Sequence, residues 1–99
     1  MDSEPKILVV DDEENILRSV EKTLFRAGFD VEVAGGNIEA FQLYQTALAD
    51  QEPFNLVIID LNMPDFSGVE ARYAGLDLLE RIKAHTPDTP VIANSAWDE

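Results

Sequence analysis

The sequence predicts an α/β fold in which a parallel sheet carries helices on both faces. Short apolar runs alternate along the chain with segments of helical periodicity. The two strongest runs, 6–10 (KILVV) and 54–59 (FNLVII), are apolar at all but one position each, which is typical of strands buried on both faces of a parallel sheet. The predicted element order is βαβαβαβ, and parallel strands joined in this way have right-handed crossovers.

The first half of the chain supplies two of the strands and one helix. The strand at 6–10 reads KILVV, and the strand at 30–34 alternates, with Val31 and Val33 on one face. Between them a helix is expected up to Ala27, with Gly28 in the left-handed position that often ends a helix. The apolar stripe of that helix comprises Ile16, Leu17, Val20, Leu24 and Phe25.

The second half repeats the pattern. Gly35 and Gly36 suggest a turn and Asn37 an N-cap, and a helical stripe follows. Pro53 ends that helix before the strand at 54–59, and 62–68 (NMPDFSG) has the composition of a loop. A third helix ends near His85, where a helix-terminal role is expected, and a last strand spans 91–94. The two helical stripes comprise Ile38, Phe41, Tyr44, Ala47 and Leu48, and then Leu76, Leu79, Ile82 and Lys83.

Composition narrows the functional classes. The 99 residues correspond to a single domain, and 7 Lys and Arg against 20 Asp and Glu give a net charge of −13. Such a chain lacks the basic face that nucleic-acid binding or electrostatic membrane anchoring requires. The 45% of apolar residues argue against disorder, and the absence of cysteine excludes thiolate chemistry. Without a leader or a membrane-length apolar run, we expect a cytoplasmic location.

Three carboxylates follow predicted strands. Asp11 and Asp12 come after the first strand, and Asp60 ends the third. If those strands are neighbours, the three carboxylates converge at one edge of the sheet. Ligands of such sheets bind at the carboxyl ends of strands, and Mg²⁺ prefers oxygen ligands of this kind. A simple acidic helix start explains Glu13 and Glu14 well but Asp60 poorly, and both interpretations stay open on these residues alone. Ser95 and Ala96, after the fourth strand, offer a hydroxyl and an amide suited to an anion.

Together these segments resemble the receiver domain of two-component response regulators. The matching stretches are KILVVDDEENI at 6–16, FNLVIIDLNMPDFSG at 54–68, GLDLLERIK at 75–83 and TPVIANSA at 89–96. The resemblance implies a flavodoxin-like (CheY-like) doubly wound sheet of strand order 2-1-3-4. It also implies a signalling phosphoprotein of a phosphorelay, which is not an enzyme in the usual sense.

The resemblance also implies a role for each site residue. Asp60 would be the phosphoacceptor, receiving a phosphoryl group from a phosphohistidine of a sensor kinase or phosphotransfer protein. Asp11, Asp12, Asp60 and the backbone carbonyl of Asn62 would hold Mg²⁺. Ser95 would be the switch hydroxyl, and the Ala96 amide would contact the phosphoryl group.

The chain departs from the family pattern in two places. Residues 69–74 (VEARYA) separate Gly68 from the third helix and form either an early helix start or a longer loop. Residues 1–99 are further expected to be a single receiver-like domain that is C-terminally incomplete, without the fifth strand, its lysine and the last helices. An edge left open in this way predicts either self-association or marginal stability as a monomer.

Two other functions remain open. One is a receiver-like interaction module that no longer cycles phosphate because it lacks that lysine. The other is a phosphatase of the haloacid dehalogenase kind, against which the adjacency of Asp11 and Asp12 argues, since that group needs an Asp-x-Asp.

Overall fold

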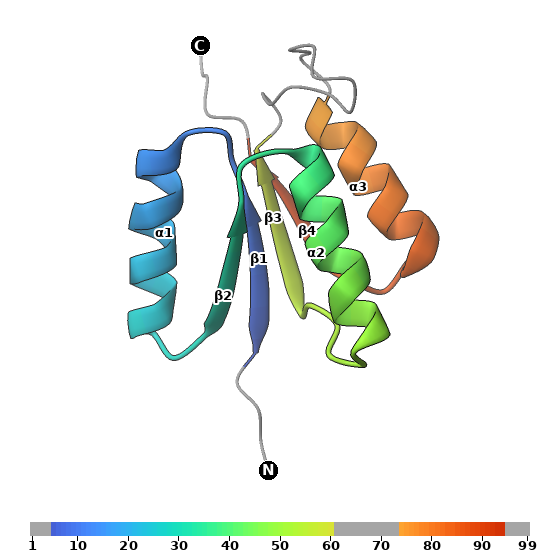
Figure 1. The fold of residues 1–99 in the computed structure, drawn as a ribbon, viewed down its shortest axis with the longest axis horizontal. Helices are drawn as coiled ribbons and strands as arrows, with labels where there is room; N and C mark the ends of the chain where they lie inside the picture. Colours follow the sequence, from blue (N-terminus) through green and yellow to red (C-terminus); the bar gives the residue numbers. More distant parts are fainter. Residues whose placement is uncertain (1–4, 61–73, 95–99) are drawn as a thin grey trace.

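The computed structural model describes residues 5–60 and 74–94 and confirms the predicted fold (Figure 1). Four parallel strands pair in the order β2-β1-β3-β4. The elements are β1 (Lys6–Val10), α1 (Glu14–Arg26), β2 (Asp30–Ala34), α2 (Asn37–Ala49), β3 (Leu56–Asp60), α3 (Ala74–His85) and β4 (Val91–Asn94). Over the described ranges, no helix combines the length and apolarity needed to cross a bilayer.

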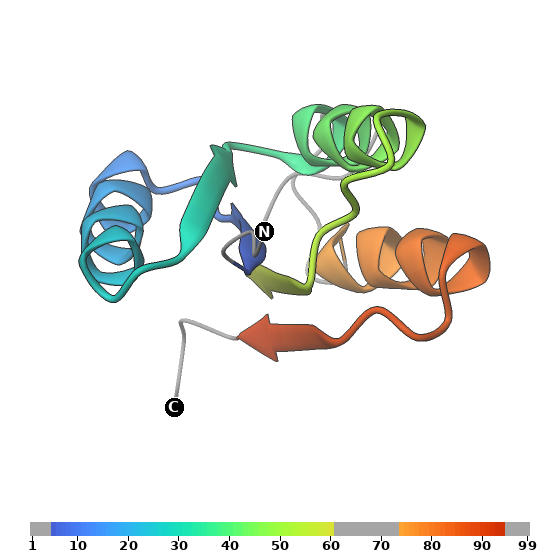
Figure 2. The same cartoon turned by 90° about the horizontal axis from the view of Figure 1, so that it is seen from below.

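The sheet is the middle of three layers. Helix α1 covers one face, and α2 and α3 lie together on the other (Figure 2). Strand β1 therefore needs apolar side chains in both directions: Ile7 and Val9 pack toward α1, and Leu8 and Val10 pack toward α2 and α3. This explains the unbroken apolar run at 6–10.

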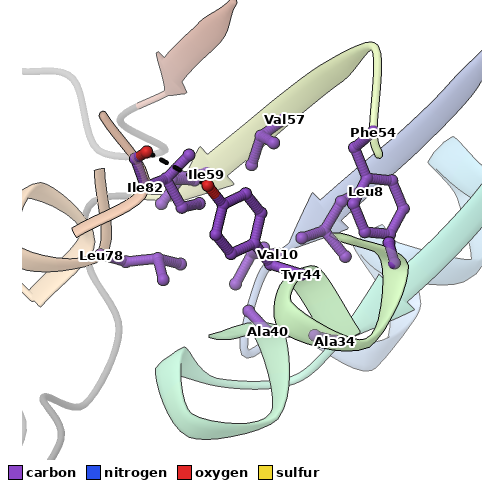
Figure 3. Packing of buried hydrophobic residues seen from close by; sticks show 11 residues of the cluster. Leu8, Val10, Ala34, Ala40, Tyr44, Phe54, Val57, Ile59, Leu78 and Ile82 are labelled. Atoms are coloured by element: carbon purple, nitrogen blue, oxygen red, sulfur yellow. Dashed lines mark hydrogen bonds between the residues drawn. The ribbon is translucent and has the colours of Figure 1, made fainter. Parts of the chain in front are cut away.

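The larger core lies between the sheet and the helix pair (Figure 3). Tyr44 of α2 is its largest fully buried side chain. Its hydroxyl lies 2.6 Å from Oγ1 of Thr86 and donates to the carbonyl oxygen of Ile82 at 3.3 Å. Thr89 donates in turn to Oγ1 of Thr86 at 2.8 Å. These bonds satisfy a buried phenol and join α2 to the end of α3.

Helix α1 ends in a Schellman motif. Gly28 has a φ of 98°, its N–H donates to the carbonyl of Phe25, and that of Phe29 donates to the carbonyl of Leu24. Leu24 and Phe29 both pack in the smaller core beneath α1. The prediction for Gly28 is confirmed, but Phe25 does not join the buried stripe, because the motif turns Leu24 inward and leaves Phe25 71% exposed.

Helix α2 differs from the prediction at its start. Gly36 is the N-cap and Asn37 is the first helical residue, buried beside the sheet, so the prediction of Asn37 as N-cap is wrong. Ile38 is 51% exposed, because the helix turns Ala40, Tyr44 and Ala47 toward the core.

Strand β3 also starts later than predicted. It begins at Leu56, after Phe54, which is buried without belonging to the strand. Pairing begins here because the backbone N–H of Asn55 donates to the Lys6 carbonyl at 2.7 Å, and the Asn55 side chain accepts from the Lys6 N–H.

One half of the α1 face has no helix over it. Helix α1 contacts β1 and β2 but, among the described elements, neither it nor any other helix covers β3 and β4 on this side. Ile92 of the edge strand β4 is 51% exposed, whereas its neighbour Val91 packs against the opposite core.

The C-terminus of α2 places a non-glycine residue in the left-handed region. Gln51 has a φ of 62°, its N–H donates to the carbonyl of Leu48, and that of Glu52 donates to the carbonyl of Ala47. The hydrogen bonds are those of the Schellman motif of α1, but a side chain occupies the position that favours glycine.

We expect Gln51→Gly to raise the free energy of unfolding by roughly 0.5–1 kcal/mol, since glycine adopts this conformation without a steric cost. Urea denaturation would measure the change in the free energy of unfolding. The control is the same replacement inside α2, Gln45→Gly, which should lower stability by about 1 kcal/mol. A loss of stability in both variants would contradict the interpretation.

Candidate functional site

Three carboxylates meet where β1 and β3 end. The two strands are neighbours, so Asp60, the last residue of β3, lies beside the residues that follow β1. Carboxylate oxygens of Asp11, Asp12 and Asp60 all lie within 4.8 Å of one another. The predicted convergence of these three side chains is confirmed.

The backbone holds Asp11 in place. Its N–H donates to the carbonyl of Ala34 at 3.1 Å, which extends the pairing of β1 and β2 by one residue. Its Oδ1 accepts from the N–H of Glu13 at 2.9 Å, at the start of α1. Asp11 and Asp60 are only 5% and 4% exposed, whereas Asp12 is exposed. The centre therefore has two buried carboxyl groups and one at the surface.

Burial and like charge act on the same group. Loss of hydration raises the pKa of Asp11 from its ordinary value of 3.8 to about 6, against the opposing effect of the Glu13 N–H. The value of about 6 already includes the smaller upward contributions of the Asp60 charge, a hydrogen bond with the Asp60 side chain and the Asp12 charge. A pKa raised in this way means that the ionised centre is electrostatically unfavourable and would be stabilised by a cation.

The donor set suits a hard divalent cation. The ligands offered are carboxylate oxygens, with neither histidine nor cysteine in the cluster, as expected for Mg²⁺ rather than zinc. The described lysines lie elsewhere. Lys6 pairs with Glu32 at 3.7 Å, Lys83 donates to the Thr89 carbonyl at 2.6 Å, and Lys22 belongs to α1.

Other predicted site residues lie outside the described part of the chain. These are Asn62, Ser95 and Ala96, together with the 69–73 part of the segment that departs from the family pattern. The backbone of β4 does end at the centre, because Asn94 is in register with Asp60.

An open cavity of about 490 Å³ adjoins the acids and includes residues that sequence reasoning missed. Glu39 of α2 lines it, and its Oε1 accepts from the N–H of Gly35 at 3.1 Å. The signal was available, because β2 is parallel to β1 and the Gly35–Gly36 turn must follow it at the same sheet edge. The lining residues are Asp11, Asp12, Glu14, Leu17, Arg18, Glu21, Val33, Gly35 and Glu39.

His85 lies at the opposite end of α3 from the sheet edge that carries the acids (Figure 1). Its Nδ1 is 2.9 Å from the Arg81 carbonyl, and its ring packs edge-on against Phe41 and Tyr44. The predicted helix-terminal role of His85 is confirmed.

The raised pKa of Asp11 predicts a pH-dependent effect of Asp11→Asn. The difference between 3.8 and about 6 corresponds to about 3 kcal/mol, a cost to folding that is absent below pH 3.8, grows up to pH 6 and is complete above it. Without added metal, the variant should therefore be more stable than the wild type at neutral pH, by roughly 1–3 kcal/mol. Urea denaturation as a function of pH would show the gain disappear as the pH falls from 6 to 4. An equal difference at all pH values would contradict the assignment.

Comparisons with known proteins agree with this geometry. The family model described as "Response regulator receiver domain" matches residues 7–99. Response regulator protein PilR of Pseudomonas aeruginosa is 37% identical over 95 residues, which is 96% of this chain and 19% of that protein. Regulatory protein AtoC of Escherichia coli is 32% identical over 94 residues, which is 95% of this chain and 18% of that protein. The chain thus spans about a fifth of the length of these relatives.

Solved structures give the same result. Chemotaxis protein CheY4 of Vibrio cholerae superposes with a TM-score of 0.80 at 27% identity, covering 98% of this chain and 72% of that one. Response regulator TrrA of Thermotoga maritima, solved in complex with Mg(2+)-BeF, superposes with a TM-score of 0.78 at 29% identity. The match covers 95% of this chain and 71% of that one. In sequence, strand order and acidic centre alike, the chain belongs to the response regulator receiver domain family.

Proposed function

We propose that the chain is a phosphoacceptor, in which Asp60 receives a phosphoryl group from a phosphohistidine of a sensor kinase or phosphotransfer protein. The observation that carries the proposal is the cluster of Asp11, Asp12 and Asp60 at the carboxyl ends of β1 and β3. A lone buried carboxylate would be protonated and a poor nucleophile, whereas one beside a bound cation stays ionised.

In the proposed reaction a carboxylate oxygen of Asp60 attacks the phosphorus. The bond from phosphorus to the histidine nitrogen breaks, the nitrogen keeps the electron pair, and an acyl phosphate forms on Asp60. Asp11, Asp12 and the carbonyl of Asn62 would hold Mg²⁺, which supplies positive charge against the phosphoryl oxygens. Ser95 would be the switch hydroxyl and the Ala96 amide would bind a phosphoryl oxygen.

Similarity supports the rest of this assignment. TrrA was solved with Mg(2+)-BeF. The three clustered carboxylates of this chain could hold a divalent cation, which favours Mg²⁺ here too. We further propose a cytoplasmic signalling role without direct contact to nucleic acid or membrane, in which the chain is modified rather than acting as an enzyme on a separate substrate.

Phosphorylation by acetyl phosphate tests the proposal. With Mg²⁺ present, the wild-type chain should gain the mass of one phosphoryl group, and Asp60→Asn should abolish the gain because the nucleophile is lost. Intact-protein mass spectrometry would measure both. Asp50→Asn, which makes the same change at an exposed position after α2, should leave the gain unaltered.

Removal of the cation is the second half of that test. Chelation, or Asp12→Asn, should lower the rate of phosphorylation without unfolding the chain. Failure of the wild type to gain mass would instead favour the alternative, a receiver-like interaction module that no longer cycles phosphate.

We also propose self-association through the β4 side of the sheet. Strand β4 is an edge strand, Ile92 is 51% exposed, and no described helix covers this part of the α1 face. A second copy of the chain would bury this apolar surface and the edge of β4 that has no partner among the described strands.

The net charge of −13 makes this association dependent on salt, because screening weakens the repulsion between two copies. Sedimentation velocity should show the share of dimer rise from about 0.01 M to about 0.15 M salt, as the screening length shortens. Ile92→Lys should abolish the dimer, whereas Ile38→Lys, at an equally exposed position on α2, should not. A monomer at all salt concentrations would refute the proposal.

A further inference from the structure

Half of the described positive charges lie on a single helix. Among the residues that the structure describes, six are Lys or Arg, and three of these, Arg18, Lys22 and Arg26, belong to α1. Their spacing of four residues places them along one side of the helix, about 6 Å apart. We call these three residues the basic stripe.

Two members of the basic stripe are available to a partner. Lys22 and Arg26 are exposed and, within the described part of the chain, neither makes an ion pair shorter than 4.0 Å. Arg18 pairs with Glu14 at 2.8 Å, but both side chains are more than 70% exposed, so the pair exchanges readily with other carboxylates.

An apolar groove lies beside the basic stripe. It has a volume of about 470 Å³ and lies between α1 and β2, with Arg18, Glu21, Lys22, Phe25 and Val31 around it. Phe25 is the most exposed large apolar side chain of the described part, at 71%. The Schellman motif that turns Leu24 and Phe29 inward holds Phe25 outward, so its exposure is built into the backbone.

The groove shares Arg18 and Glu21 with the cavity beside the acids, but its apolar part lies farther along α1. Helix α1 runs from the acidic sheet edge at Glu14 to the opposite edge at Arg26, and β2 begins at that opposite edge with Asp30 (Figure 1). Phe25 and Val31 therefore lie toward the amino ends of the strands, and the proposed phosphotransfer chemistry does not account for them.

We propose that this groove binds an acidic amphipathic helix of a partner protein. A helix lying along α1 presents carboxylates four residues apart at the same spacing of about 6 Å as the basic stripe. One large apolar side chain of that helix would pack against Phe25 and Val31. The chain as a whole carries a net charge of −13, and its excess of carboxylates outside the basic stripe repels an acidic partner, so the basic stripe selects both the place and the orientation of docking.

A library of displayed helical peptides tests the proposal without knowledge of the natural partner. Peptides of about 16 residues, long enough to form a helix, would be panned on the full chain in its unphosphorylated form. The expected result is enrichment of sequences with Asp or Glu at four-residue spacing beside Leu, Phe or Trp. In NMR spectra of the full chain, their binding should shift the amide signals of 18–31.

Paired variants separate the groove from non-specific attraction. The double variant Lys22→Gln with Arg26→Gln should bind the enriched peptides about ten-fold more weakly than the wild type. The same change in net charge on α2, Gln42→Glu with Gln45→Glu, should leave affinity within about two-fold. Phe25→Ser should weaken binding, and Ile38→Ser, at an exposed position of α2, should not. Affinity should fall with added salt.

Several outcomes would overturn the proposal. These are a library without enrichment, enriched peptides without acids, NMR shifts confined to other elements, and equal losses in the two charge variants. Binding to vesicles rich in phosphatidylserine that is as tight as peptide binding would also overturn it, in favour of a lipid surface. The test does not depend on phosphorylation, so a failure here leaves the role of Asp60 untouched, and the converse also holds.

Discussion

The pairing of β1 with β3 is the constraint on which the rest of the molecule depends. These two parallel strands are adjacent in space but separated in the chain by α1, β2 and α2, so the acids at their ends meet only once the sheet has formed. The pairing places Asp11 and Asp60 together in a poorly hydrated position. The apolar interactions of β1 on both faces of the sheet must therefore outweigh the repulsion between those carboxylates.

The elements were largely predictable because the signals were local. Continuous apolar runs identified β1 and β3, alternation identified β2, and Gly28 marked the end of α1. The predictions that failed concern details that depend on tertiary packing. The orientation of α2 about its axis, and with it the exposure of Ile38, is set by which side chains the sheet accommodates. Gln51 could not have been predicted to be left-handed, because its residue type gives no such signal.

The candidate site was predictable to a similar degree. Asp11, Asp12 and Asp60 follow predicted strands, and the rule that parallel strands end at one edge was enough to bring them together. The burial of Asp11 and the donor N–H of Glu13 were not predictable, since each depends on the path of a turn, whereas the same sheet-edge rule could have placed Glu39 beside the acids. Similarity to known receivers supplied the proposed roles, which the residues alone left open between a metal site and an acidic helix start.

The position of β4 has a consequence for motion. Strands β1 and β3 have a partner on both sides, whereas β4 is bonded only to β3 among the described strands. Opening β1 requires disruption of the whole sheet, but β4 can detach by losing one ladder and the contacts of Val91 with the core. Amide protons of β4 should thus exchange faster than those of β1. Strand β4, which ends beside Asp60, is thus held less firmly than β1 or β3, so the surroundings of that carboxylate can rearrange while the core stays intact.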